Sequence, residues 1–193
     1  AELEARCRAN PTNRMMHHHV FDTELALRVV AEAGWTMHGV DAMRPFHVAV
    51  LARCLKEFPR FNASLSADGT ALIFKGSVHI GVAVDTPQGL MVPVIRDADG
   101  LSVGEISDVL SDLAERARTR RIRPEHLGGA SMTISSLGGI GGEGFTPIVN
   151  PPELAILGLS RTEIRPVWDG TGFRPVPMAP LDLTYDHRVI NGA

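Results

Sequence analysis

The sequence predicts a mixed α/β domain built around one large sheet, and three observations lead to this expectation. Segments with helical spacing of apolar residues come first, short β-branched segments dominate the second half, and one long helical segment is inserted among them. This order is typical of a domain in which helices pack against a single sheet. The chain has 193 residues, 44% hydrophobic and 21% charged, which is enough to bury the core of one domain.

Three segments are expected to form helices. Residues 21–34 and 44–59 carry apolar side chains at helical spacing, and each is bounded by residues that start or stop helices. Residues 102–122 form the third, because Ser102 is followed three residues later by Glu105, the pattern of a capping box.

Five further segments are expected to form strands. Residues 70–99 contain two β-branched runs around the turn signal DTPQG, which predicts a strand, a turn and a second strand. The others are residues 130–138, 154–160, 164–170 and 173–187. Between the first two of these, residues 138–153 are rich in glycine and proline and are expected to be a loop.

Composition excludes several function classes. The net charge of −3 and the pI near 6.2 argue against a general nucleic-acid binder. No apolar stretch is long enough to predict a membrane span, and the N-terminal segment lacks the apolar core of a signal peptide. Cys7 and Cys54 lie far apart in sequence, which favours a reducing compartment without a disulfide framework.

Three motifs suggest binding chemistry that their context does not support. The glycines of residues 138–144 resemble a phosphate loop, but the prolines that follow forbid the helix such a loop needs. His17, His18 and His19 could bind a metal or belong to a tag, yet no second ligand cluster at zinc spacing exists, so no metal site is predicted. Residues 116–123 carry several arginines, which suit a solvated helix end, with a phosphate contact as the alternative.

The C-terminal stretch LTYDHRVINGA holds the strongest candidate for chemistry. His187 lies between an aspartate and an arginine, where a strand is expected to end, and Asn191 follows four residues later. A neutral histidine is suited to remove a proton near neutral pH. A lone histidine is more often a packing residue, so the motif needs its context.

That context is an ordered set of segments: IGVAVDTPQGLMVPVIRDAD, MTISSLGGIGGEGFTPIVNPPELAILGLSR and LDLTYDHRVING, preceded by LKEFPRFNASL. Together they resemble the catalytic domain of the 2-oxo acid dehydrogenase acyltransferases over residues 45–193. In their residues, these segments are most similar to the bacterial acetyltransferases of pyruvate dehydrogenase complexes. The resemblance implies a two-layer fold like that of chloramphenicol acetyltransferase, a mixed sheet with helices on one side.

The resemblance also implies a reaction and its residues. The family transfers an acyl group, here most similar to the acetyl type, between the thiols of dihydrolipoamide and coenzyme A. Coenzyme A is a substrate, and the lipoyl group is carried on a separate domain. His187 is then the general base and Ser135 the donor to the oxyanion, with Asn191 as the third site residue. The motif of the family is HxxxDG, so Asn191 replaces an aspartate. Residues that contact coenzyme A are not assigned.

The assembly is likewise implied by resemblance. We expect a homotrimer with active sites between subunits, built into a 24-subunit core, with a 60-subunit core as the alternative. We expect residues 1–193 to be one catalytic domain that lacks the C-terminal helix of the family and its lipoyl and subunit-binding domains, through which other components would be bound. The expected location is the bacterial cytoplasm.

Two alternatives remain open. The chain could be a catalytically inactive scaffold paralogue, although such paralogues typically lose the histidine that this chain keeps. It could instead be an acetyltransferase of the chloramphenicol type, which shares the fold and the histidine motif.

Overall fold

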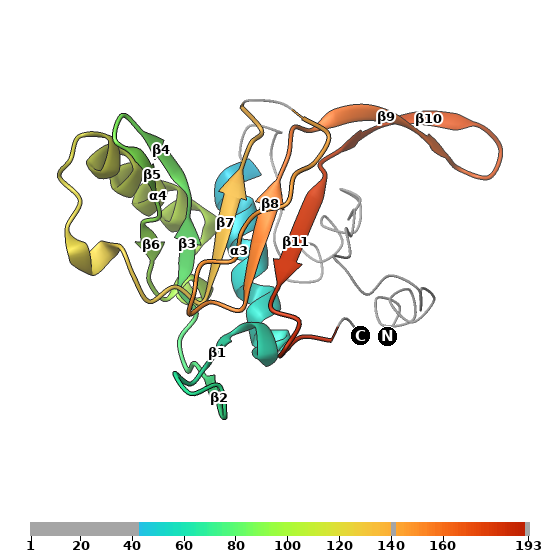
Figure 1. Ribbon diagram of the computed structural model, residues 1–193. Coiled ribbons are helices and arrows are strands. Elements are labelled where there is room, and N and C mark those ends of the chain that lie inside the picture. The colour runs from blue at the N-terminus through green and yellow to red at the C-terminus, as the bar shows by residue number, and fades with distance from the viewer. Residues whose placement is uncertain (1–42, 140–141, 192–193) are drawn as a thin grey trace.

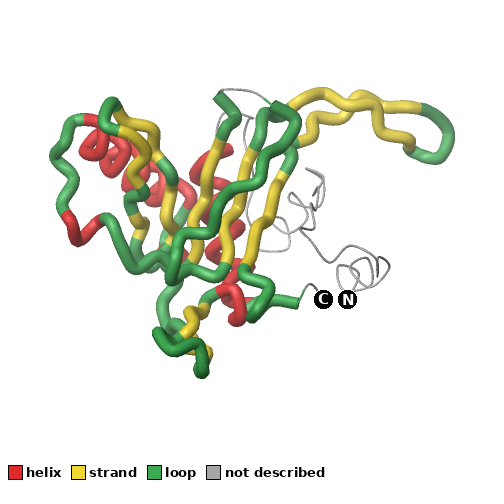
Figure 2. Tube along the Cα trace, viewed as in Figure 1, coloured by secondary structure: helices red, strands yellow, loops and turns green. Residues whose placement is uncertain are grey.

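A mixed sheet forms the centre of the computed structural model, which describes residues 43–139 and 142–191. Its strands are β3 (Ile80–Val82), β6 (Val94–Ile95), β7 (Met132–Ser136), β8 (Ala155–Leu159) and β11 (Leu181–Tyr185). These five strands lie in the order β11-β8-β7-β3-β6 (Figures 1 and 2). The inner pairs β8–β7 and β7–β3 are parallel, and the two outer pairs are antiparallel. The expected α/β class with one principal mixed sheet is confirmed.

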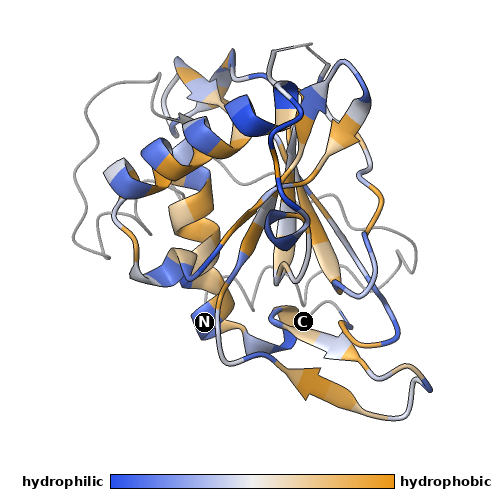
Figure 3. Cartoon of the chain, turned by 90° about the vertical axis from the view of Figure 1, so that its left-hand side faces the viewer, coloured by the Kyte–Doolittle hydropathy of each residue, from blue (hydrophilic) through white to orange (hydrophobic). Residues whose placement is uncertain are grey.

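Two α-helices cover one face of this sheet, as expected. They are α3 (Met43–Glu57) and α4 (Val103–Arg118), and both lie to one side of the strands in Figure 3. Helix α4 has the predicted capping box. The Ser102 hydroxyl accepts from the N–H of Glu105, and the carboxylate of Glu105 accepts from the N–H of Ser102 at 2.8 Å.

Helix α4 is shorter than predicted. It ends at Arg118 although helical spacing continues to residue 122, because Arg120 adopts a positive φ of 59° that a right-handed helix cannot contain. Short 3-10 turns join the other elements: η2 (Pro59–Phe61), η3 (Ala98–Gly100) and η4 (Pro124–His126).

The core lies between the helices and the sheet because side chains alternate along each strand. In β7, Met132 and Ile134 belong to the core, so Thr133 and Ser135 face the other side of the sheet. The same alternation applies along β8 and β11. The face away from the helices therefore carries Thr133, Ser135 and Asp182.

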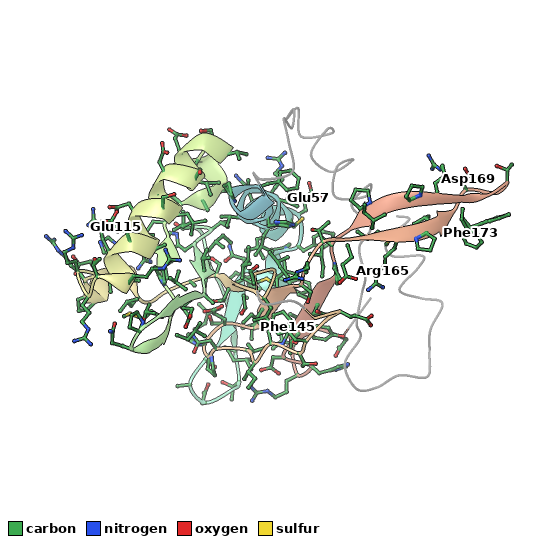
Figure 4. All side chains as sticks on the ribbon, turned by 90° about the horizontal axis from the view of Figure 1, so that it is seen from above. Glu57, Glu115, Phe145, Arg165, Asp169 and Phe173 are labelled. Atoms are coloured by element: carbon green, nitrogen blue, oxygen red, sulfur yellow. The ribbon has the colours of Figure 1, made fainter. Side chains whose placement is uncertain are left out.

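Three hairpins extend from this body. They are formed by β1 (Ala63–Leu65) with β2 (Leu72–Phe74), β4 (Val84–Thr86) with β5 (Gly89–Met91), and β9 (Glu163–Trp168) with β10 (Phe173–Met178). The β9–β10 hairpin projects from the molecule, and Asp169 and Phe173 mark its tip in Figure 4. The rings of Trp168 and Phe173 pack edge to face there, with centroids 5.2 Å apart.

Two strand predictions are wrong in detail. Residues 70–99 contain five short strands instead of two. The chain leaves the main sheet after Val82, makes the β4–β5 hairpin and returns to the sheet at β6 after Pro93. The predicted turn is the tip of that hairpin, where the Thr86 hydroxyl donates to the Gly89 carbonyl oxygen at 2.6 Å. Residues 173–187 form two strands, since the chain turns from the hairpin into the sheet at Pro180.

The predicted helix at residues 21–34 and the three histidines at residues 17–19 lie outside the described residues. Among the described helices, none has the length and apolar character required to cross a membrane.

Candidate active site

His187 lies in the turn that directly follows β11, at the end of the sheet where β7 and β8 begin (Figure 1). The N–H of Asp186 donates to the Leu154 carbonyl oxygen at 2.7 Å and ties the turn to the start of β8. The Asp186 carbonyl oxygen accepts from the N–H groups of Val189 and Ile190 at 3.1 and 3.0 Å. The exposed His187 side chain is therefore carried on a well-anchored backbone.

The aspartate and arginine that flank His187 bind each other. Nε of Arg188 lies 3.0 and 3.1 Å from the two carboxylate oxygens of Asp186, and Nη2 lies 2.6 Å from Oδ2. These hydrogen bonds hold the pKa of the Asp186 carboxyl below its usual value. Because Arg188 occupies the Asp186 carboxylate, this aspartate acts as a clamp on the turn and does not orient the imidazole.

The His187 ring is available for proton transfer. Its described contact is with the Tyr185 ring, at a centroid distance of 5.7 Å and a tilt of 37°. Within the part of the chain that the structure describes, neither ring nitrogen makes a hydrogen bond. The described residues of the same chain therefore supply no hydrogen-bond acceptor to either ring nitrogen.

Ser135 is the fourth residue of β7, half-buried on the sheet face away from the helices. Its hydroxyl makes no hydrogen bond to any residue of the described ranges 43–139 and 142–191. A hydroxyl without an internal acceptor can donate to a group that enters from outside the chain.

The structure does not bring Ser135 and His187 together. Ser135 is paired with Gly158, and Gly158 is paired with Asp182, which lies three residues before the end of β11 at Tyr185. Two strand spacings and three residues of strand place the Cα atoms of Ser135 and Tyr185 about 14 Å apart. His187 lies beyond Tyr185, so hydrogen-bond contact between the two site residues of one chain is impossible.

Asn191 is exposed and follows the buried Ile190, which anchors the end of the turn in the core. It lies at the same end of the sheet as His187. Asn191 makes no hydrogen bond to the described residues, so it too is open to an external group.

A polar cluster of the buried Thr133 and Glu153 with the half-buried Lys75 was not predicted from the sequence. The Thr133 hydroxyl donates to Oε1 of Glu153 at 2.9 Å, and Nζ of Lys75 donates to the Ala130 carbonyl oxygen at 2.7 Å. Burial raises the pKa of Glu153 and lowers that of Lys75, while the attraction between the two charges opposes both shifts. The sequence signal was a glutamate placed directly before the apolar run of residues 154–160.

The glycine-rich loop contains no helix in its described part and lies against the sheet. Gly142 has a φ of +102°, as expected for a tight loop that requires glycine. The Phe145 N–H donates to Oδ2 of the buried Asp182 at 3.0 Å. Asp182 is a second residue that the sequence analysis did not single out, and its signal was a carboxylate inside the buried strand segment LDLT.

The arginine-rich motif at residues 116–123 lies within the described residues and has the contacts of a solvated helix end. The arginines at the end of α4 are exposed and several pair with nearby acids, as expected of a solvated helix end: Arg116 with Asp112, Arg121 with Glu115 and Arg123 with Glu125. No group of three or more potential metal ligands occurs among the residues that the structure describes.

Comparison with known proteins identifies the relatives of this chain. The family model of the 2-oxoacid dehydrogenases acyltransferase (catalytic domain) matches residues 17–193. The dihydrolipoyllysine-residue acetyltransferase component of the pyruvate dehydrogenase complex of Pseudomonas aeruginosa is 53% identical over 169 residues, which cover 87% of this chain. The chain spans only 31% of the length of that relative.

Solved structures show the same relationship. A structure of the Azotobacter vinelandii dihydrolipoamide acetyltransferase superposes with a TM-score of 0.81 and 45% identity, covering 99% of this chain and 79% of that one. The cubic core of the pyruvate dehydrogenase multienzyme complex gives 0.81 and 46%, with the same coverage. Chloramphenicol acetyltransferase, at 14% identity, gives a TM-score of 0.51 over 99% of this chain and 87% of its own. This last likeness confirms the expected fold type.

Proposed function

Because the chain belongs to the 2-oxoacid dehydrogenase acyltransferase family, by its catalytic domain, we propose that it transfers an acetyl group between the thiols of dihydrolipoamide and coenzyme A. The acetyl type is favoured by the 53% identity with an acetyltransferase component of a pyruvate dehydrogenase complex. The observation that carries the proposal is a histidine on an anchored turn, with its ring nitrogens free of hydrogen bonds to the described residues.

The proposed reaction begins with a proton transfer to His187. A free thiol has a pKa of about 8.5, so a base is needed to generate the thiolate near neutral pH. The thiolate attacks the thioester carbonyl carbon and forms a tetrahedral intermediate with a negative oxygen. The intermediate then expels the second sulfur as a thiolate, which takes the proton back from His187. No covalent acyl-enzyme is required.

In this proposal, Ser135 donates its hydroxyl proton in a hydrogen bond to the negative oxygen. The separation of Ser135 and His187 within one chain supports a site shared between subunits, with the histidine from one and the serine from its neighbour. The hydroxyl of Ser135 and the side chain of Asn191, which make no hydrogen bond to the described residues, suit such an arrangement.

The spacing of the three residues supports their assignment. The Azotobacter vinelandii structure comes from an investigation of the role of a serine, a histidine and an asparagine in the catalytic mechanism of that enzyme. The intervals of 52 residues from serine to histidine and four from histidine to asparagine are the same as those from Ser135 to His187 and from His187 to Asn191.

We further propose that the protein forms a homotrimer and that trimers build a 24-subunit core. The likeness to the cubic core of a pyruvate dehydrogenase complex supports this assembly over a 60-subunit particle. Lipoyl and subunit-binding domains outside the 193 residues would supply the lipoyl group and bind the other components. The bacterial relatives support a location in the bacterial cytoplasm.

The proposal is tested by assaying acetyl transfer from acetyl-CoA to dihydrolipoamide with the assembled protein and its His187→Ala variant. We expect the variant to lose about 10²-fold or more in kcat, the scale for removal of a general base. Near-normal transfer by His187→Ala would refute the mechanism. An inactive wild-type protein would favour the scaffold paralogue, and transfer to chloramphenicol in a parallel assay would favour the other alternative.

A further inference from the structure

Three residues form a row across the sheet on the face away from the helices. Ser135 in β7 is paired with Gly158 in β8, and Gly158 is paired with Asp182 in β11. One end of the row carries the hydroxyl proposed to bind the oxyanion, and the other end carries a carboxylate that is only 5% exposed. The residue between them has no side chain.

Gly144 and Phe145 of the glycine-rich loop lie over this row. The Phe145 ring lies over Gly158 so closely that a Cβ atom at residue 158 would be 2.9 Å from its Cζ atom and 3.0 Å from its Cε1 atom. Figure 4 places Phe145 on the side of the sheet opposite to the helices. Gly144 also approaches the carboxylate of Asp182 closely, since a Cβ atom there would lie 3.3 Å from both oxygens.

Asp182 fixes the loop in this position. Its Oδ2 atom accepts from the Phe145 N–H at 3.0 Å, and a hydrogen bond to a buried carboxylate is stronger than one between neutral groups. The Phe145 ring is thereby held between Asp182 and Ser135, directly beside the strand position of the serine.

We propose that Asp182 is a positioning residue of the acyl transfer reaction, which holds residues 142–146 against the sheet so that Phe145 forms a fixed wall beside Ser135. The inference rests on the proposed function. A donor to an oxyanion is effective when its orientation is fixed and water is excluded from it. A loop that is not held down would admit water to Ser135 and let its hydroxyl turn away.

A direct electrostatic effect of the Asp182 charge on the oxyanion would slow the reaction, which is opposite to the effect of positioning. Asp182 lies two strand spacings, about 10 Å, from Ser135, and a negative charge there disfavours a second negative charge on the oxyanion. If charge alone mattered, removal of the Asp182 carboxylate would increase the rate. The positioning role instead predicts a decrease on loss of the acceptor and retention when a neutral acceptor of the same shape is kept.

The test is a double-mutant cycle on the assembled protein, with kcat and KM measured for acetyl transfer from acetyl-CoA to dihydrolipoamide. We expect Asp182→Ala to lower kcat about tenfold or more with little change in KM, and to have less than about a threefold further effect in the Ser135→Ala background. Asp182→Asn should stay within about threefold of wild type because its amide oxygen still accepts from the Phe145 N–H. Thr184→Ala, on the same face two residues along, is the matched control and should change kcat less than about twofold.

Equal losses from Asp182→Ala in the two backgrounds would overturn the inference, as would an unchanged or increased kcat. If Asp182→Ala does not assemble, Gly158→Ala supplies the same cycle, because its Cβ atom would lie 2.9 Å from the Phe145 ring and 3.3 Å from the Asp182 Cβ atom, with the Asp182 carboxylate retained. His187→Ala separates the two proposals. If that variant is inactive while Ser135→Ala retains full kcat, acyl transfer stands and the role of Asp182 falls.

Discussion

A site shared between subunits predicts that two inactive variants restore each other. The chain separates Ser135 and His187 by more than about 14 Å between Cα atoms, so the proposed site would take them from different copies. Ser135→Ala subunits still supply His187, and His187→Ala subunits still supply Ser135. A site formed from the right pair is therefore complete, although neither variant is active alone.

The activity expected of the mixture follows from random assembly of the two variants into trimers. A site is intact when its histidine comes from a Ser135→Ala subunit and its serine from a His187→Ala subunit. At equal amounts this occurs in about a quarter of the sites of a cyclic trimer, so the mixture should regain about 25% of wild-type activity. Each variant alone should retain about 1% or less. Because the recovered activity follows the product of the two fractions, it should be greatest at equal amounts and fall on either side.

The assay is acetyl transfer by particles co-expressed from both variants, with the subunit ratio measured by mass spectrometry. Separately purified variants, mixed without exchange of subunits, are the control and should stay inactive. Activity of the co-expressed particles no greater than that of this control would refute the shared site, because it would mean that both residues must come from one chain.

Further predictions concern single residues. Ser135→Ala should lower kcat about 10²–10³-fold with little change in KM, measured by steady-state kinetics, and an unchanged kcat would assign the oxyanion to another donor. Asn191→Asp should keep activity within about tenfold in the same assay, because the neutral asparagine shows that a carboxylate is not essential there; a larger loss would contradict this. Burial raises the pKa of Glu153, so its ionisation opposes folding as pH rises from the ordinary glutamate pKa through the raised value. Glu153→Gln should therefore raise Tm near pH 7 and change it little near pH 4, where the carboxyl is largely protonated in both states; equal shifts at both pH values would be inconsistent with this. Asp169→Asn is the control of opposite sign, because hydrogen bonds from the Thr171 and Gly172 N–H groups lower its pKa; its stabilisation is present above the ordinary aspartate pKa and is lost as pH falls, so this variant should lower Tm near pH 7.

Local signals in the sequence predicted local structure well. The capping box of Ser102 and Glu105 marked the start of α4, and the order of elements gave the α/β class. The pairing of distant strands was not predictable in this way, because it depends on contacts between segments far apart in the chain. The distance between Ser135 and His187 therefore emerged only from the register of β7, β8 and β11.

Buried polar residues were the other gap in the sequence analysis. Asp182 and Glu153 stand next to apolar residues in the chain, and the sequence alone does not say which face of the sheet each one occupies. Their roles depend on partners that only the fold brings close: Phe145 for Asp182, and Thr133 for Glu153. The site residues themselves were assigned by family resemblance, which remains their support.

The prolines of the β9–β10 hairpin have a consequence for aggregation. Pro166 is paired with Pro175, and Pro177 with Ile164, all within one ladder that runs unbroken from Glu163 to Trp168. Antiparallel pairs alternate between those that exchange hydrogen bonds and those whose N–H groups point outward, so an intact ladder requires the prolines to occupy the second kind. The outer edge of β9 therefore lacks the donor of residue 166, and that of β10 lacks the donors of residues 175 and 177, so neither edge offers another strand a complete set of donors. The arm can expose Trp168 and Phe173 to a partner while resisting the edge-to-edge strand addition that leads chains into amyloid-like stacks.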